Sequence, residues 1–175
     1  DVVKSEISAI GGRVDIASSQ AKGTTFTIYL PLTLAVTQAV LVRSGASILA
    51  VSSVMVEQVL RVKAETLTSL YEAQSVSFQD PSYPLHYVRH LFGTAGATEI
   101  QPYNSVLLLR SGIQRIALHI DELLANQEVV VKAIGPHLAR VPGVVGATVL
   151  ADGGIVLIVN PVQLAHRARA KPSRP

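Results

Sequence analysis

A short unit of two strands joined by Arg-Ser-Gly occurs twice in this sequence and constrains the fold more than any other feature. In the first copy, the alternating stretch 38–42 leads to Arg43-Ser44-Gly45, and 47–51 returns. The second copy begins 67 residues later, and its parts are 106–109, 110–112 and 114–120. A further strand-like stretch follows each copy, at 59–62 and 128–132. Repetition of one supersecondary unit predicts two similar small β-barrels within one domain.

The composition and the remaining turn signals also favour a β-rich fold. Val, Ile and Thr account for 46 of the 175 residues, and side chains branched at Cβ fit a pleated sheet better than a helix. A third hairpin is predicted over 147–159, with its turn at Asp152-Gly153-Gly154, where glycine readily adopts a positive φ. One helix is predicted between the two copies, over Leu85–Phe92, because Pro84 precedes it and Gly93 follows it.

The first thirty residues form a separate pattern. Apolar residues recur at three- and four-residue spacing from Val3 to Ile10, which predicts a helix over 1–10 that ends at Gly11-Gly12. The alternating stretches 13–17 and 24–30 then predict a hairpin. A unit of about thirty residues is too small to bury a core alone. We therefore expect residues 13–30 to be disordered, to fold back, or to pair with another copy of the chain.

The net charge of +3 is concentrated at one end of the chain. Four of the 15 Lys and Arg residues follow His166 and no acid does, which leaves 11 basic against 12 acidic residues elsewhere. Nucleic-acid binding is disfavoured because it needs a clustered basic face and aromatic stacking platforms, and aromatic residues make up only 5%. The absence of Cys excludes thiolate catalysis and Cys-type metal sites. No apolar run reaches the ~18 residues of a membrane span, so no membrane insertion is expected.

The titratable residues do not form a recognisable catalytic or metal site. His86 and His90 stand four residues apart on the predicted helix, a zinc-binding spacing, but no third ligand lies at a usable distance, so we expect no metal. His119 and Asp121 lack a nucleophile on a G-x-S-x-G elbow, which argues against a hydrolase. Asp121-Glu122 is interpreted as a strand-end turn, because adjacent strand residues point to opposite faces.

Several motifs stand in a fixed order at the start of the chain: Asp1-Val2-Val3-Lys4, Ile10-Gly11-Gly12-Arg13-Val14, Gly23-Thr24-Thr25-Phe26 and Leu30-Pro31-Leu32-Thr33-Leu34-Ala35. This set resembles the last helix, the second glycine box and the following junction in the ATP-binding domain of CheA-type chemosensory histidine kinases. The stretch 141–148, with Asp152-Gly153 and the strand 155–160, resembles the final hairpin of CheW-like domains. The resemblance implies three parts: 1–35 as the remnant of the ATPase domain, 36–166 as a CheW-like regulatory domain, and 167–175 as a basic linker or tail.

The resemblance implies a mainly β fold of two five-stranded SH3-like barrels that share one continuous core, with a short α/β remnant at the N-terminus. It also implies a regulatory docking role in a chemosensory kinase of the chemotaxis type or its pilus-type relatives. The partners would be a CheW-like adaptor and the cytoplasmic tip of a chemoreceptor, and docking would control autophosphorylation of the parent kinase. The expected location is cytoplasmic, in membrane-associated receptor arrays. The basic tail suggests that a further domain, such as a receiver, follows.

Of the family's nucleotide site, the sequence retains only Gly23, Thr24 and Thr25, which would contact ATP only in the intact parent. The Asn- and His-rich helix, the D-x-G-x-G loop and the phosphoacceptor histidine are missing. We therefore expect this chain to have no catalytic residues and to bind no cofactor, whereas the parent kinase would use ATP and Mg²⁺.

For the docking role, we predict that the partner-binding residues lie beside the turn-prone segment Ala125-Asn126-Gln127. They are Leu123, Leu124, Val129 and Val130, and the alternative is that these four are simply core residues. Two other functions remain open at this point. One is a free-standing CheW-like scaffold, and the other is an unrelated small barrel that binds a ligand or nucleic acid.

Overall fold

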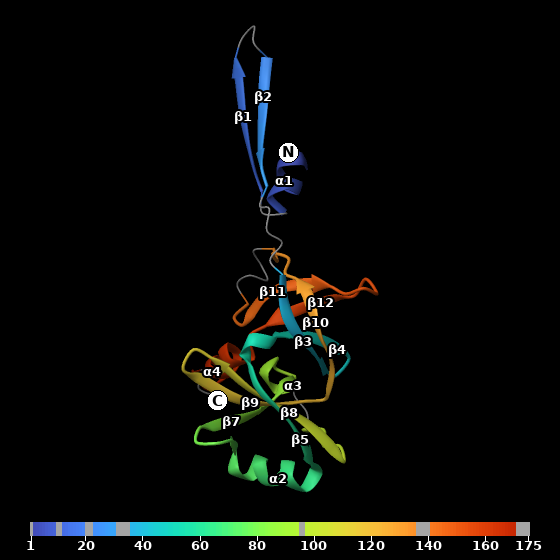
Figure 1. Cartoon of the computed structure of the whole chain (residues 1–175), viewed down its shortest axis with the longest axis vertical. Helices are drawn as coiled ribbons and strands as arrows, with labels where there is room; N and C mark the ends of the chain where they lie inside the picture. The colour runs from blue at the N-terminus through green and yellow to red at the C-terminus, as the bar shows by residue number, and fades with distance from the viewer. Residues whose placement is uncertain are drawn as a thin grey trace.

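The computed structural model of the 175-residue chain describes residues 2–9, 12–19, 23–30, 36–94, 97–135 and 141–170 (Figure 1). The helices are α1 (Val2–Ala9), α2 (Ala64–Ala73), α3 (Val88–Leu91) and α4 (Pro161–Ala170), with a short 3₁₀ turn, η1, at Ser53–Met55. The strands are β1 (Arg13–Ser19), β2 (Gly23–Tyr29), β3 (Val36–Ser44), β4 (Ser47–Ser52), β5 (Val56–Lys63), β6 (Ser75–Ser77), β7 (Ser82–Tyr87), β8 (Tyr103–Ser111), β9 (Gln114–Ile120), β10 (Glu122–Val130), β11 (Val144–Val149) and β12 (Ile155–Val159).

The N-terminal helix and hairpin form at the predicted positions, so the expectation that the hairpin is disordered or folds back is wrong. Strands β1 and β2 pair antiparallel from Arg13 opposite Tyr29 to Ser19 opposite Gly23. Figure 1 shows this two-stranded sheet beside α1 and apart from the two barrels, and every residue of β2 is exposed. The junction at 31–35 lies outside the described residues.

The remaining strands form two five-stranded antiparallel-rich sheets, which confirms the predicted pair of barrels. The first barrel has the strand order β10-β3-β4-β12-β11, and the second has β5-β8-β9-β7-β6. In the first barrel, Lys132 and Ala147 exchange two backbone hydrogen bonds, which brings the end of β10 against β11. In the second barrel, helix α2 packs between β5 and β6.

Each barrel combines strands from both copies of the internal repeat. One repeat is β3–β7 and the other is β8–β12, yet each barrel takes its first two strands from one repeat and its last three from the other. Both repeats use a two-residue turn with glycine first, and Gly45 and Gly112 have φ values of 63° and 62°. A positive φ at the first turn position matches the twist of hairpin strands and favours glycine. The two Arg-Ser-Gly segments therefore fix equivalent hairpins.

The core divides into three clusters, so the expected single continuous core is wrong. Residues of β3 alternate: Ala39 and Leu41 point into the first barrel, whereas Val40 and Val42 point into a layer between the barrels. Strand β8 repeats this pattern around the second barrel, with Val106 and Leu108 inside and Leu107 and Leu109 in the shared layer. Both faces of these strands are buried, because each barrel packs one wall against the other.

The predicted helix over Leu85–Phe92 is largely wrong. Residues 85–87 belong to β7, where Leu85 pairs in parallel with Ala117 of β9, and only Val88–Leu91 is helical. The local helix signals at Pro84 and Gly93 were outweighed by pairing with a distant strand.

The helices α2 and α4 were not predicted. Leu67, Leu70 and Tyr71 of α2 have helical spacing and contact the core of the second barrel. Helix α4 starts with Pro161, and the side-chain Oδ1 of Asn160 accepts a hydrogen bond of 3.0 Å from the N–H of Gln163. This helix runs past the predicted start of the tail at residue 167 to Ala170.

Candidate docking surfaces and the polar cluster between the barrels

Strand β10 carries the four residues predicted to bind a partner, but it does not present them together. Leu123 is 36% exposed, whereas Val129 is 4% exposed and lies in the core of the first barrel. Leu124 packs against the same core, and Val130 is half-buried. Val129 is therefore a structural residue and not a surface anchor. The segment 125–127, predicted to be turn-prone, is the middle of the strand and pairs with β3.

A β-bulge explains why the adjacent residues Leu124 and Ala125 both pack against the core of the first barrel. The pairing of β10 with β3 shifts between Leu123 and Ala125, so Leu124 is the extra residue. Strand β5 has the same irregularity between Val56 and Gln58, which makes Glu57 the equivalent extra residue in the other repeat. A bulge locally re-aims a side chain and increases the twist of the strand.

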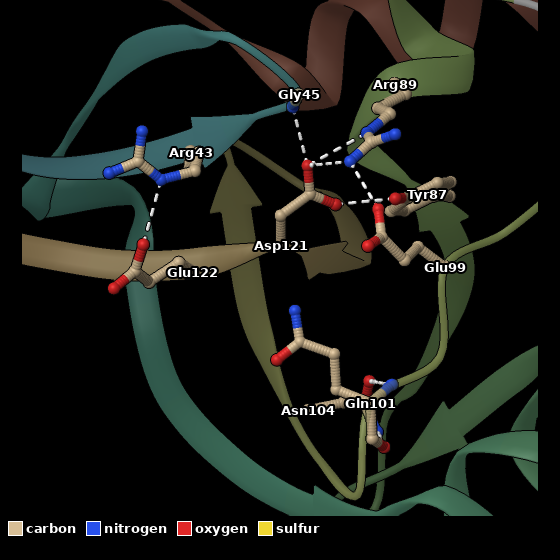
Figure 2. Close-up of polar contacts among 9 residues, drawn as sticks. All are labelled: Arg43, Gly45, Tyr87, Arg89, Glu99, Gln101, Asn104, Asp121 and Glu122. Atoms are coloured by element: carbon tan, nitrogen blue, oxygen red, sulfur yellow. Dashed lines mark hydrogen bonds and ion pairs between the residues drawn. The ribbon is translucent and has the colours of Figure 1, made fainter.

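Asp121 forms the centre of a polar cluster where the two barrels meet (Figure 2). Its side chain is 6% exposed and lies at the bend between β9 and β10. Oδ2 accepts hydrogen bonds from the backbone N–H of Gly45 at 2.6 Å and from Arg89 Nε at 2.9 Å. Oδ1 accepts a hydrogen bond of 2.5 Å from the hydroxyl of Tyr87. One carboxylate therefore joins the β3–β4 turn of the first barrel to β7 and α3 of the second.

The hydrogen bonds keep Asp121 ionised despite its burial. Burial raises the pKa of its carboxyl, but the donors at Gly45, Tyr87 and Arg89 stabilise the charged form, and the net pKa is lowered. Burial and the hydrogen bond to Asp121 together raise the pKa of Tyr87 to about 12, so this hydroxyl stays protonated and donates.

The cluster extends outward through Arg89 and Glu99. Arg89 Nη2 lies 2.6 Å from Glu99 Oε2, in the segment that precedes β8. The buried Asn104 holds this segment, because its side chain bonds both the N–H and the C=O of Gln101 at 2.9 and 2.7 Å. Glu122 points away from Asp121 and pairs with Arg43 at 2.8 Å (Figure 2). The predicted strand-end turn is confirmed only for Asp121, which lies at the bend, because Glu122 is already the first residue of β10.

His119 is buried next to this cluster and is 1% exposed. Its ring stacks on Tyr87 with a centroid distance of 4.9 Å, and its Nδ1 lies 2.9 Å from the hydroxyl of Tyr71. Burial lowers the pKa of His119 to about 4, against a smaller opposing effect of the Asp121 charge. His119 is therefore neutral at neutral pH, and its ring packs against Tyr87 and Tyr71.

The two histidines considered as metal ligands are not one helix turn apart. His86 is on β7 and His90 is on α3, where its ring meets the edge of Tyr87 at 5.2 Å. Among the described residues, no group of three or more His, Cys, Asp or Glu is placed to hold a metal ion. Likewise, no helix within the described ranges is long and apolar enough to cross a membrane.

Gly23, Thr24 and Thr25 form the start of β2 in the exposed hairpin. Gly23 has a φ of 89° with open space around its Cα, and the hydroxyl of Thr24 lies 3.0 Å from that of Ser18. These residues are all exposed. A role toward a nucleotide would need further walls from other segments.

The second junction between the barrels lacks an equivalent of the Asp121 cluster. The residue equivalent to Asp121 in the first repeat, 67 positions earlier in the chain, is Val54, and its side chain is 88% exposed. Asn160 of the C-terminal part instead reaches Ser111 Oγ at 3.4 Å beside the β8–β9 turn. One junction is thus fixed by a buried carboxylate, and the other leaves an apolar side chain at the surface.

The outer face of the β11–β12 hairpin is the second candidate docking surface. Val149 pairs directly with Ile155, and both side chains are exposed, Ile155 at 77%. Val145, exposed as well, lies on β11 four residues before Val149. The register of β11 shifts between Val144 and Gly146, so Val145 is a bulged residue, and the directly paired Val149 and Ile155 form the centre of this apolar surface. Exposed aliphatic side chains grouped in this way are typical of protein contacts.

The double barrel with exchanged strands defines a CheW-like domain, and the comparisons agree with it. Residues 38–169 match the CheW-like domain family, and the chain belongs to this family. The chain is similar to the chemotaxis protein CheA of Salmonella typhimurium, with 36% identity over 161 residues, which is 91% of this chain and 24% of that protein. It is 34% identical over 179 residues to CheA of Rhizobium meliloti, which covers 100% of this chain and 23% of that protein.

A third relative and a solved structure extend these comparisons. CheA of Treponema pallidum is 31% identical over 165 residues, covering 94% of this chain and 20% of that protein. The chain therefore spans about a fifth to a quarter of the length of these relatives. The scaffolding protein TtCheW from Thermoanaerobacter tengcongensis matches with a TM-score of 0.54 and 12% identity, over 71% of this chain and 88% of that one. At this identity, the likeness shows the fold alone.

Proposed function

We propose that this chain is the regulatory docking part of a chemotaxis-type histidine kinase, and that it binds a CheW-like adaptor and chemoreceptors to control autophosphorylation of the parent. The observation that carries this proposal is the extent of the CheA similarity. The match to the Rhizobium meliloti protein covers the whole chain, including residues 1–37, which lie outside the CheW-like match at 38–169. A free-standing scaffold would not require that N-terminal segment.

Exposed apolar side chains on the first barrel support docking. The directly paired Val149 and Ile155, the exposed Val145 and the exposed Leu123 are suited to anchor a partner. Because the partner would be another CheW-like barrel, we expect a modest interface of the signalling type.

The nucleotide role belongs to the parent kinase in this proposal. Gly23, Thr24 and Thr25 would supply one wall of an ATP site that other segments complete, with Mg²⁺ held elsewhere. The open space around Gly23 and the exposure of Thr24 and Thr25 fit this role. Chemoreceptor contact and a place in membrane-associated arrays in the cytoplasm follow from the same proposal.

Titration calorimetry of the chain against the CheW-type adaptor of the same genome, with ATP titrated in parallel, tests this function. We expect saturable adaptor binding and no heat with ATP. The variants Ile155→Asp and Leu123→Asp should each weaken adaptor binding, and Gln127→Asp, at an exposed polar position of β10, is the matched control. Heat with ATP but none with the adaptor would overturn the proposal.

A further inference from the structure

A pocket lies between α4 and the second barrel, away from the polar cluster and the β11–β12 face. Its volume is about 400 Å³. The apolar part of the lining comes from Pro81 and Pro84 near the β6–β7 turn, from Ile113 in the β8–β9 turn and from Ala165 of α4. Ile113 is 94% exposed at the edge of the pocket. An exposed aliphatic side chain beside a hollow offers a contact for an apolar group of a ligand.

The lining holds basic side chains and no acidic one. Arg115 of β9, His86 of β7 and His166 of α4 line the pocket beside the neutral polar residues Ser82 and Gln114, and none of its described lining residues is Asp or Glu. Helix α4 contributes no acid, and Arg167 follows His166 in it.

Arg115 shares its carboxylate partner with a second guanidinium. Its buried Nε lies 3.5 Å from Glu57 Oε2 without a hydrogen bond. The same carboxylate holds Arg110 at 2.8 Å and the Tyr83 hydroxyl at 2.6 Å. These two guanidinium groups therefore keep an excess positive charge, and a ligand carboxylate at the exposed part of the Arg115 side chain would balance it.

We infer that this pocket binds an acidic segment of a protein partner, with a carboxylate held by Arg115 and the imidazoles of His86 and His166. An apolar residue next to that carboxylate would rest on Ile113 and the two prolines. The site lies apart from the β11–β12 face and from Leu123, so it can be occupied while the adaptor is bound. This inference does not depend on the proposed kinase role.

The test uses two small probes that share one apolar body. 4-Phenylbutyrate carries a carboxylate, and 4-phenylbutylamine carries an ammonium in its place. Each is titrated into the ¹⁵N-labelled chain and followed by NMR. We expect saturable shifts of the Ile113, Ile116 and Ala165 amides with the carboxylate, and at least about tenfold weaker binding of the amine, because charge-assisted hydrogen bonds decide the difference.

Variants separate this site from a general effect of charge. His166→Glu adds a negative charge at an exposed position of the pocket wall without changing Glu57, and Arg115→Gln removes the guanidinium. Each variant should weaken the binding of 4-phenylbutyrate about tenfold. Arg61→Gln, which removes an exposed cation stacked on Tyr103, should not. Unchanged melting temperatures and NMR spectra away from the pocket verify the fold of each variant.

Three outcomes overturn the inference. The first is equal binding of the two probes, which would define a merely apolar hollow. The second is the lack of saturable shifts at millimolar concentrations of 4-phenylbutyrate. The third is displacement of that probe by a short oligothymidine that binds more tightly at the same residues, which would point to nucleic acid. Adaptor binding is measured separately, so its failure is distinguishable from these results.

Discussion

Asp121 accepts a 2.6 Å hydrogen bond from the backbone N–H of Gly45, and this contact links residues that are 76 positions apart in the chain and belong to different barrels. The same carboxylate holds Tyr87 and Arg89 from a third segment. The relative position of the two barrels on this side therefore depends on a single buried side chain.

Replacement of Asp121 by Ala should destabilise the domain by about 3–5 kcal/mol, because it leaves the buried donors without a charged partner. Urea denaturation followed by circular dichroism measures this change. The matched control is Glu122→Gln, since Glu122 is exposed and pairs only with the half-exposed Arg43; its cost should stay below about 1 kcal/mol. Similar costs for the two variants would show that Asp121 does not hold the barrels.

The buried His119 predicts a loss of stability in mild acid. Its pKa is about 4 in the folded state and 6.5 in the unfolded chain, so the unfolded state binds more protons between these values. The stability is therefore complete above pH 6.5 and falls toward pH 4, by up to about 3 kcal/mol. Asp121 stays ionised over this range because its pKa is lowered.

The free energy of unfolding between pH 4.5 and 7 measures this effect. His119→Gln should flatten the pH dependence in that window. His166→Gln, at an exposed position of α4, should leave the slope as it is. An unchanged slope in His119→Gln would mean that another group carries the pH dependence.

Side-chain substitutions to Ala at the two ends of β10 should have different effects on stability and on adaptor binding. Val129→Ala removes methyl groups from the first barrel's core and should cost about 2 kcal/mol. Leu123→Ala should change stability by less than about 1 kcal/mol, since its side chain is 36% exposed, but should weaken adaptor binding about tenfold if Leu123 is an anchor. Thermal unfolding and calorimetry on both variants distinguish the core role from the docking role.

The exposed hairpin predicts self-association of the chain. Ile16 faces Phe26 across β1 and β2, and both side chains are more than half exposed. Pairing of two such faces or edges would cover them, so light scattering at rising concentration should show a dimer. Phe26→Asp should restore the monomer, and Thr27→Asp on the opposite face should do so less. A strict monomer in the unaltered chain, with an ordered hairpin, contradicts the prediction.

The hairpins could be predicted because their signals are local. Gly45, Gly112 and Gly153 all have positive φ, and alternating apolar residues flank each turn. The assignment of 85–87 to a helix failed because the pairing of Leu85 with Ala117 depends on a strand that comes later in the chain. Similarly, nothing near Asp121 in the sequence indicates that Arg89 is its partner. The Leu67, Leu70 and Tyr71 spacing was present in the sequence and could have revealed α2.

The exchange of strands between the repeats sets the order in which the barrels become complete during synthesis. The second barrel uses the continuous segment from β5 to β9, so all its strands have left the ribosome once Ile120 has emerged. The hairpin β3–β4 is made earlier but finds its partners only when β10, β11 and β12 follow. Until these strands emerge, only the finished second barrel can cover the apolar faces of the β3–β4 hairpin. The second barrel therefore acts as the template on which the first barrel closes.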